Sequence, residues 1–185
     1  MFLLKRLACV CVMVAGTVQA EEAALGLVDR LEVRSHAKLL ELRDQDGVTL
    51  APFTTDGCSG GMSATWKTVA DMFPGFADLH EHTPPWESCC VTHDQAYHVG
   101  GADLTPKASF DARLEADQIL EQCVLATAAE NYDMLQAEYG VTVPQIDTAF
   151  RMISSAMFDA VRFGGGPCSG LPWRWGYGWP QCWPG

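Results

Sequence analysis

Hydrophobic residues recur at helical intervals in four separate parts of the chain. Apolar side chains three or four positions apart lie on one face of a helix, which is typical of a helix that packs against a core. The predicted helices cover residues 21–42, 83–99, 105–138 and 144–162. Residues 48–86 are rich in Gly, Pro, Ser and Thr and are expected to form loops. The pattern therefore predicts a mainly α fold.

The two middle helices have clearly marked ends. Thr83 and Thr105 each precede proline, an arrangement that caps a helix and begins its first turn. Gly100 and Gly101 end the first of these two helices, and only a short link separates them from Thr105. We therefore expect a pair of long antiparallel helices, with extra N-terminal and C-terminal helices outside the pair.

The first twenty residues have the features of a secretory signal peptide. Two basic residues precede an uncharged apolar run over residues 7–18, and Ala20 ends a small-residue cleavage pattern. The run is too short to cross a bilayer as a helix. We expect cleavage after Ala20 and a secreted or periplasmic protein. A lipoprotein anchored through Cys9 or Cys11 is the alternative.

Charge and cysteine content narrow the possible partners. Without residues 1–20 the net charge changes from −11 to −13, because two of the 12 basic residues and none of the 23 acidic ones are lost. An acidic chain of this kind is a poor ligand for nucleic acid and for anionic lipid. Six of the eight cysteines remain, which predicts three disulfides in an oxidising compartment. Residues 21–185 are long enough for a single domain.

The stretch SCCVTHDQAY combines two adjacent cysteines with an adjacent His and Asp. On a helix, Cys89, His93 and Tyr97 share one face, and Cys90 and Asp94 form a neighbouring stripe. Adjacent cysteines do not readily bond to each other, so each needs a different partner. Two such bonds would make this helix a rigid platform for the His and the Asp.

A carboxylate interrupts the apolar stripe of the next helix. Asp117 stands between Leu114 and Leu120, where the helical period would place Leu or Ile. A buried charge is costly without a partner, and His93 is the nearest candidate if the two helices pack antiparallel. An Asp that holds one imidazole nitrogen leaves the other free as a general base. A solvated or capped Asp117 is the alternative.

A glycine-rich loop precedes these helices. In the segment TTDGCSGGMS, Gly57, Gly60 and Gly61 surround Cys58. Such a loop is free to turn its backbone carbonyls inward. Carbonyls together with a carboxylate are ligands that Ca²⁺ prefers, so this loop is a candidate calcium site.

Together these motifs resemble those of the secreted phospholipase A2 superfamily. The chain has the order Cys-Cys-x-x-His-Asp-x-x-Tyr, after a Gly-Cys loop and before an Asp that precedes a Cys by six residues. The similarity covers about residues 53–125. It implies that His93 is the base that activates water, that Asp117 orients it and that Tyr97 supports Asp117. The implied reaction is calcium-dependent hydrolysis of the sn-2 ester of phospholipids at a membrane interface, which releases fatty acid and lysophospholipid.

The same resemblance implies the ligands of the calcium ion. Asp94 would supply the carboxylate, and Gly57, Ser59 and Gly61 would supply three backbone carbonyls. Ser59 stands where the family generally has glycine, although a serine retains the carbonyl. Calcium is therefore the expected cofactor.

The resemblance also implies the disulfide pairing. One bridge of the family would join positions 96 and 116, and both are alanine here, so both halves of that bridge are absent together. The two cysteines of the tail then remain for each other. The expected disulfides are Cys58–Cys90, Cys89–Cys123 and Cys168–Cys182.

Two other functions are compatible with parts of this pattern. A zinc site could use His80, His82, His93 and His98, but it would leave the cysteine pattern and Asp117 unexplained. A non-catalytic, calcium-dependent lipid- or protein-binding module on the same fold is the stronger alternative. Such a module would not need the complete catalytic set, so the sequence favours an enzyme.

The segment after residue 163 is rich in aromatic residues, Gly and Pro. Its tryptophan and tyrosine rings are of the kind that settle at a membrane interface. The alternative, which we favour, is that they pack over the helices.

Overall fold

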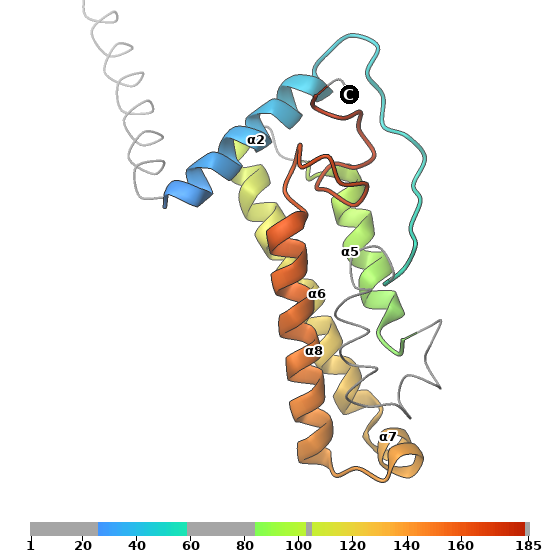
Figure 1. The fold of residues 1–185 in the computed structure, drawn as a ribbon. Helices are drawn as coiled ribbons and strands as arrows, with labels where there is room; N and C mark the ends of the chain where they lie inside the picture. The colour runs from blue at the N-terminus through green and yellow to red at the C-terminus, as the bar shows by residue number, and fades with distance from the viewer. Residues whose placement is uncertain (1–25, 59–83, 103–104, 184–185) are drawn as a thin grey trace, which may run out of the picture.

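The computed structural model describes residues 26–58, 84–102 and 105–183, and most of these residues are helical (Figure 1). The helices are α2 (Leu27–Arg43), α5 (Glu87–Val99), α6 (Pro106–Glu130), α7 (Tyr132–Tyr139) and α8 (Val143–Gly164). No strand occurs within these ranges, and the prediction of a mainly α protein is confirmed. The predicted signal peptide, and with it the cleavage after Ala20, lies outside the described residues.

The segment that we predicted as one helix over residues 105–138 is divided, and that prediction was wrong. The division lies at Asn131, whose φ is −121° and ψ is 14°. Its side-chain Nδ2 donates to the carbonyl of Thr127 at 2.8 Å, and its backbone N–H donates to Ala128. A short amide side chain that bonds the preceding turn competes with the helical backbone. Helix α6 therefore ends here, and α7 leads to the start of α8 (Figure 1).

Local capping signals mark several of the other helix ends. Thr83, the predicted cap of the second helix, lies outside the described residues, and α5 begins only at Glu87, after Trp86. The side chain of Thr105 accepts from the N–H of Ala108 at 3.2 Å. Thr142 and Gln145 form a reciprocal capping box at the start of α8. Gly100 follows α5 with φ +72°, in the left-handed region that favours glycine. These local signals fix where the helices begin and end before any packing is considered.

Helix α6 occupies the centre of the arrangement. It contacts α2, α5 and α8, while α7 contacts α8. Figure 1 shows α6 and α8 running side by side, with α2 crossing near the end of α8. Side chains from three different helices can therefore meet around α6.

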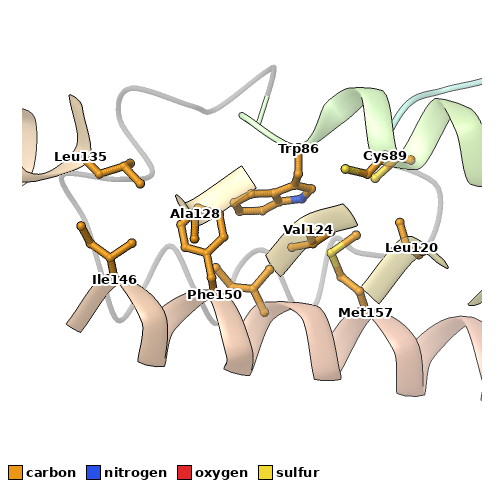
Figure 2. Close-up of a cluster of buried hydrophobic side chains, with 11 residues drawn as sticks. Trp86, Cys89, Leu120, Val124, Ala128, Leu135, Ile146, Phe150 and Met157 are labelled. Atoms are coloured by element: carbon orange, nitrogen blue, oxygen red, sulfur yellow. The ribbon is translucent and has the colours of Figure 1, made fainter. Parts of the chain in front are cut away.

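The main hydrophobic core lies between α5, α6 and α8. Figure 2 shows Ile146, Phe150 and Met157 projecting from α8 toward the other helices. The rings of Trp86 and Phe150 meet edge to face with 5.4 Å between their centres, a favourable arrangement for two aromatic rings. Val124 of α6 is fully buried in the same cluster. This core fixes the spacing between α8 and the α5–α6 pair.

Three disulfides join the cysteines as expected. Their pairs are Cys58–Cys90, Cys89–Cys123 and Cys168–Cys182. The adjacent cysteines of α5 thus reach two different partners, one in the preceding loop and one on α6. Disulfides of this number indicate an oxidising environment. Among the described helices, none has the length and apolar character needed to cross a membrane.

The aromatic tail packs against the end of α5. A helix leaves its last carbonyls without partners inside the helix, and the tail provides donors for three of them. The bonds run from the backbone N–H of Gly176 to Tyr97, from that of Gly178 to His98 and from the indole N–H of Trp179 to Val99. Trp175 is almost completely buried. These contacts show that the tail is a packed part of the domain.

The core predicts the effect of truncating Phe150. We expect Phe150→Ala to lower the free energy of unfolding by about 3 to 5 kcal/mol, because it opens a cavity beside Trp86. Met152 lies on the same helix but is 52% exposed. Met152→Ala should therefore change the free energy of unfolding by at most about 0.5 kcal/mol. Urea unfolding of the oxidised protein measures both. Equal effects of the two substitutions would contradict this assignment of the core.

Candidate active site

A buried carboxylate on α6 joins the predicted site residues. Asp117 is completely buried, and its Oδ1 accepts two hydrogen bonds from α5. Nε2 of His93 donates at 2.8 Å and the hydroxyl of Tyr97 donates at 2.7 Å. The structure thus brings His93, Tyr97 and Asp117 together. The alternative of a solvated Asp117 does not apply.

The hydroxyl of Tyr97 is held as a donor. Burial, together with the neighbouring charge of Asp117, raises the pKa of Tyr97 well above its ordinary value of 10, although Arg113 acts in the opposite direction. Nε of Arg113 donates to the same hydroxyl at 3.0 Å. Tyr97 therefore stays protonated and gives its one proton to Asp117.

Two arginines and a glutamate that sequence reasoning missed complete this network. Nη1 of Arg162 donates to Oδ2 of Asp117 at 2.9 Å, and its Nη2 donates to Glu32 at 3.1 Å. Arg113 also donates to Glu32 and is itself fully buried. The two carboxylates and the two guanidinium groups balance in charge. A sequence signal for Arg113 existed, since it lies four residues before Asp117 and therefore on the same helix face. The structure buries it more deeply than Leu114, which we had placed in the apolar stripe.

Glu32 is strongly held in its ionised form. Burial alone would raise its pKa, but the bond to His36 and the charges of Arg113 and Arg162 outweigh burial and lower the pKa to about 2. Arg113 also donates to the carbonyls of Val161 and Arg162 at 2.7 and 2.8 Å. Both carbonyls belong to the last turn of α8, and that of Val161 also accepts from the backbone N–H of Gly165 at 2.8 Å. The network therefore ties α2, α6 and α8 together.

A second cluster has the residue types of a hydrolytic triad, but it is buried and no substrate can reach it. Nδ1 of His36 lies 2.8 Å from Oγ of Ser109, and its Nε2 lies 3.5 Å from Glu32. Ser109 is completely buried and accepts from the indole N–H of Trp175 at 3.1 Å. Burial lowers the pKa of His36, so it stays neutral. This cluster has a structural role.

The predicted metal carboxylate lies beside the glycine loop. Oδ2 of Asp94 accepts from the hydroxyl of Thr55 at 2.5 Å, and that hydroxyl accepts from the N–H of Gly57 at 3.0 Å. Gly57 has φ +64°, in the left-handed region that favours glycine, and a β-carbon there would displace the side chain of Glu87. Ser59 and Gly61, the other predicted ligands, lie outside the described residues.

Two carboxylates, those of Asp56 and Asp94, lie near each other beside this loop. Burial and the neighbouring Asp56 raise the pKa of Asp94, although the Thr55 bond and His93 oppose that change. The hydroxyl of Tyr177 donates to the carbonyl of Thr54 at 2.5 Å, so the tail also holds this loop. Burial and both aspartates raise the pKa of Tyr177 to about 12. A cation bound here would relieve the repulsion between the two carboxylates.

The candidate zinc ligands are not gathered within the described residues. No group of three or more His, Cys, Asp or Glu is placed to share a metal ion in residues 26–58, 84–102 and 105–183. His98 is buried, and its ring packs against Phe53 and Tyr177. His80 and His82 lie outside these ranges. The calcium site is a different case, because most of its predicted ligands are backbone carbonyls.

Two hollows border His93. The smaller, of about 50 Å³, lies between the loop at Gly57, Asp94 and an apolar wall. That wall is formed by Leu120, Met157, Ala160, Val161 and Trp173. The larger, of about 370 Å³, lies between α5 and α6, and Ala96 and Ala116 both border it. The two alanines that stand where the resembling family has a bridge therefore leave open space.

The charge network predicts how stability depends on acid. The folded-state pKa of Glu32, about 2, lies below its ordinary value of 4.5. Its stabilising contribution is therefore complete above about pH 4.5 and is lost as the pH falls toward 2. We expect Glu32→Gln to flatten this part of the stability curve. Urea unfolding between pH 2 and 6 measures the effect, and Glu41→Gln, at an exposed site on the same helix, should leave the curve unchanged.

Comparison with known proteins identifies no relative of this chain. No family model, curated protein or solved structure matches it. The function proposed below is therefore argued from the motifs and from the geometry of the described residues.

Proposed function

We propose that this protein is a calcium-dependent hydrolase of phospholipid sn-2 ester bonds, similar to the secreted phospholipases A2. One observation carries the proposal. Nε2 of His93 is bonded to the buried Asp117, while no described residue bonds its Nδ1. The ring is thus oriented as a general base and lies next to the predicted calcium carboxylate, Asp94.

The base has the arrangement that water activation requires. Asp117 fixes the proton of His93 on Nε2, which leaves the lone pair of Nδ1 for the proton of an attacking water. His93 then passes this proton to the leaving oxygen of the lysophospholipid. No covalent intermediate with the enzyme is needed. Tyr97 keeps Asp117 in place through its hydroxyl bond.

Asp94 and the carbonyls of Gly57, Ser59 and Gly61 would hold the calcium ion. Calcium bound there supplies a Lewis acid that polarises the ester carbonyl and stabilises the developing oxyanion. Two features of the described residues fit a calcium ion. Gly57 has the backbone conformation that only glycine adopts easily, and Asp94 lies close enough to Asp56 for each to feel the other's charge.

The arrangement of α5 and α6 supports a platform of two antiparallel helices. In order along α5, the contacts are Cys89 with Cys123, His93 with Asp117 and Tyr97 with Arg113. Residue numbers rise on one helix as they fall on the other. A disulfide at one end and the buried hydrogen bonds at the other hold the pair in register.

The smaller hollow, of about 50 Å³, has room for an ester group but not for a whole acyl chain. One side presents His93 and Asp94, and the other presents Met157, Val161 and Trp173. Polar groups that face an apolar wall are typical of sites for amphipathic ligands. The acidic chain offers little attraction to anionic lipid, so binding to a membrane interface would depend on such apolar contacts.

The proposal predicts calcium-dependent release of fatty acid. The oxidised protein should release fatty acid and lysophospholipid from phosphatidylcholine vesicles with Ca²⁺ but not with EGTA. His93→Gln retains a donor toward Asp117 but removes the base, and should lower the rate at least about 100-fold. Ser88→Ala, an exposed site on the same helix, should retain the wild-type rate. Thin-layer or mass-spectrometric detection of both products provides the measurement.

If wild-type protein binds Ca²⁺ but releases no fatty acid from any vesicle, the proposed hydrolase is wrong. A non-catalytic calcium-dependent binding module would then fit the same structure. An activity that persists in EGTA would instead contradict the role of calcium.

Calcium binding predicts a change in thermal stability that does not depend on catalysis. A Ca²⁺ concentration 100 times the dissociation constant should stabilise the folded protein by about 2.7 kcal/mol. Asp94→Asn should abolish most of this gain, because it removes the one charged ligand. Asp111→Asn, at an exposed position bonded to Lys107, should retain the full gain. Calorimetry with and without Ca²⁺ compares the three proteins, and an equal gain in all of them would exclude Asp94 as a ligand.

A further inference from the structure

Arg162 connects the candidate active site to the N-terminal helix. It lies in the last turn of α8, at the point where α8 approaches α2 (Figure 1). One branch of its guanidinium group donates to Asp117 and the other to Glu32, at 2.9 and 3.1 Å. A planar guanidinium that bonds two carboxylates at once fixes their relative orientation.

The two oxygens of Asp117 have different partners. Oδ1 accepts from His93 and Tyr97, and Oδ2 accepts from Arg162. A carboxylate can rotate about its last side-chain bond, where the preferred angles are broad. Bonds to Oδ1 alone leave this rotation possible. The bond from Arg162 to Oδ2 fixes the plane of the carboxylate and directs Oδ1 at the imidazole.

Arg162 is itself held in place from two sides. Glu32 accepts from its Nη2 through both carboxylate oxygens. Arg113 donates to the backbone carbonyls of Val161 and Arg162, which fixes the end of α8. The side chain of Arg162 is 19% exposed, so without Glu32 its long side chain would have other rotamers available.

We infer that Arg162, held by Glu32, is a positioning residue that orients Asp117 and thereby selects the Nε2–H tautomer of His93. Its catalytic meaning rests on the proposed function, because that tautomer leaves Nδ1 free to accept the proton of water. The tautomer itself is a property of the protein alone. Helix α2 lies outside residues 53–125, which carry the motif resemblance. By this inference it nevertheless contributes to the site, because its Glu32 holds Arg162.

The tautomer can be measured directly. Long-range ¹H–¹⁵N correlation spectra of the labelled, oxidised protein at one fixed pH distinguish the protonated from the unprotonated ring nitrogen of His93. Wild-type protein should show the proton on Nε2. Arg162→Met removes both donors and should give a mixture of tautomers with faster exchange of the ring proton. Arg162→Lys should lie between the two, because one ammonium group cannot reproduce the planar fork.

Arg151 provides the matched control. It lies on the same helix, is exposed, and bonds the backbone of its own helix at Asp147. Arg151→Met should leave the His93 spectrum unchanged. In the vesicle assay, Arg162→Met should lower kcat about 10- to 100-fold with KM within about two-fold, since the orientation of the base is lost and the substrate contacts are kept.

Removal of one member of a buried ion pair can unfold a protein. The double variant Glu32→Gln/Arg162→Met, which also removes the charge opposite Arg162, is therefore measured beside the single one. An unchanged His93 tautomer in a folded Arg162 variant would overturn the inference. A mixed tautomer supports it even if wild-type protein hydrolyses no phospholipid, so the failure of the proposed activity and the failure of this inference are distinguishable.

Discussion

The structure depends on the burial of one charge. Asp117 sits in the interior of α6, where an unpaired carboxylate would cost several kcal/mol. Its partners come from α5 and α8, and the partner from α8, Arg162, also pairs with Glu32 of α2. The helices must therefore meet at this point for the charge to be tolerated. The same requirement that fixes the packing also gives the imidazole of His93 its orientation.

The rigidity of α5 has two separate sources. At its beginning, adjacent cysteines bond in two directions, to the loop at Cys58 and to α6. At its end, donors from the tail bond the carbonyls of the last turn. His93 lies between these two fixed points, so the position of its ring depends little on the local stability of an isolated helix, which is marginal for a segment of this length.

Local patterns in the sequence predicted what depends on nearby residues. The Thr105-Pro106 signal and Gly100 located helix ends, and the interrupted apolar stripe located Asp117. Thr83-Pro84 did not mark the first residue of α5, which begins at Glu87. The break at Asn131 was missed because helical periodicity continues across it, and only the amide side chain marks it. Glu32 and Arg162 were missed because they meet across 130 positions of the chain, and no local pattern encodes such a contact. The aromatic tail was ambiguous, since amphipathic rings suit a membrane interface as well as a protein surface.

The bonds from residues 176–179 to the end of α5 determine when, during synthesis, the candidate site can be completed. The helix that carries His93 is synthesised about eighty residues before the donors that complete its last turn. The same late segment holds the loop at Thr54 through Tyr177. A nascent chain can form α5 and α6, but the candidate site is fully assembled only after residues 176–179 have been synthesised and have folded back. Assembly of the site is thereby delayed until residues 176–179 have been synthesised.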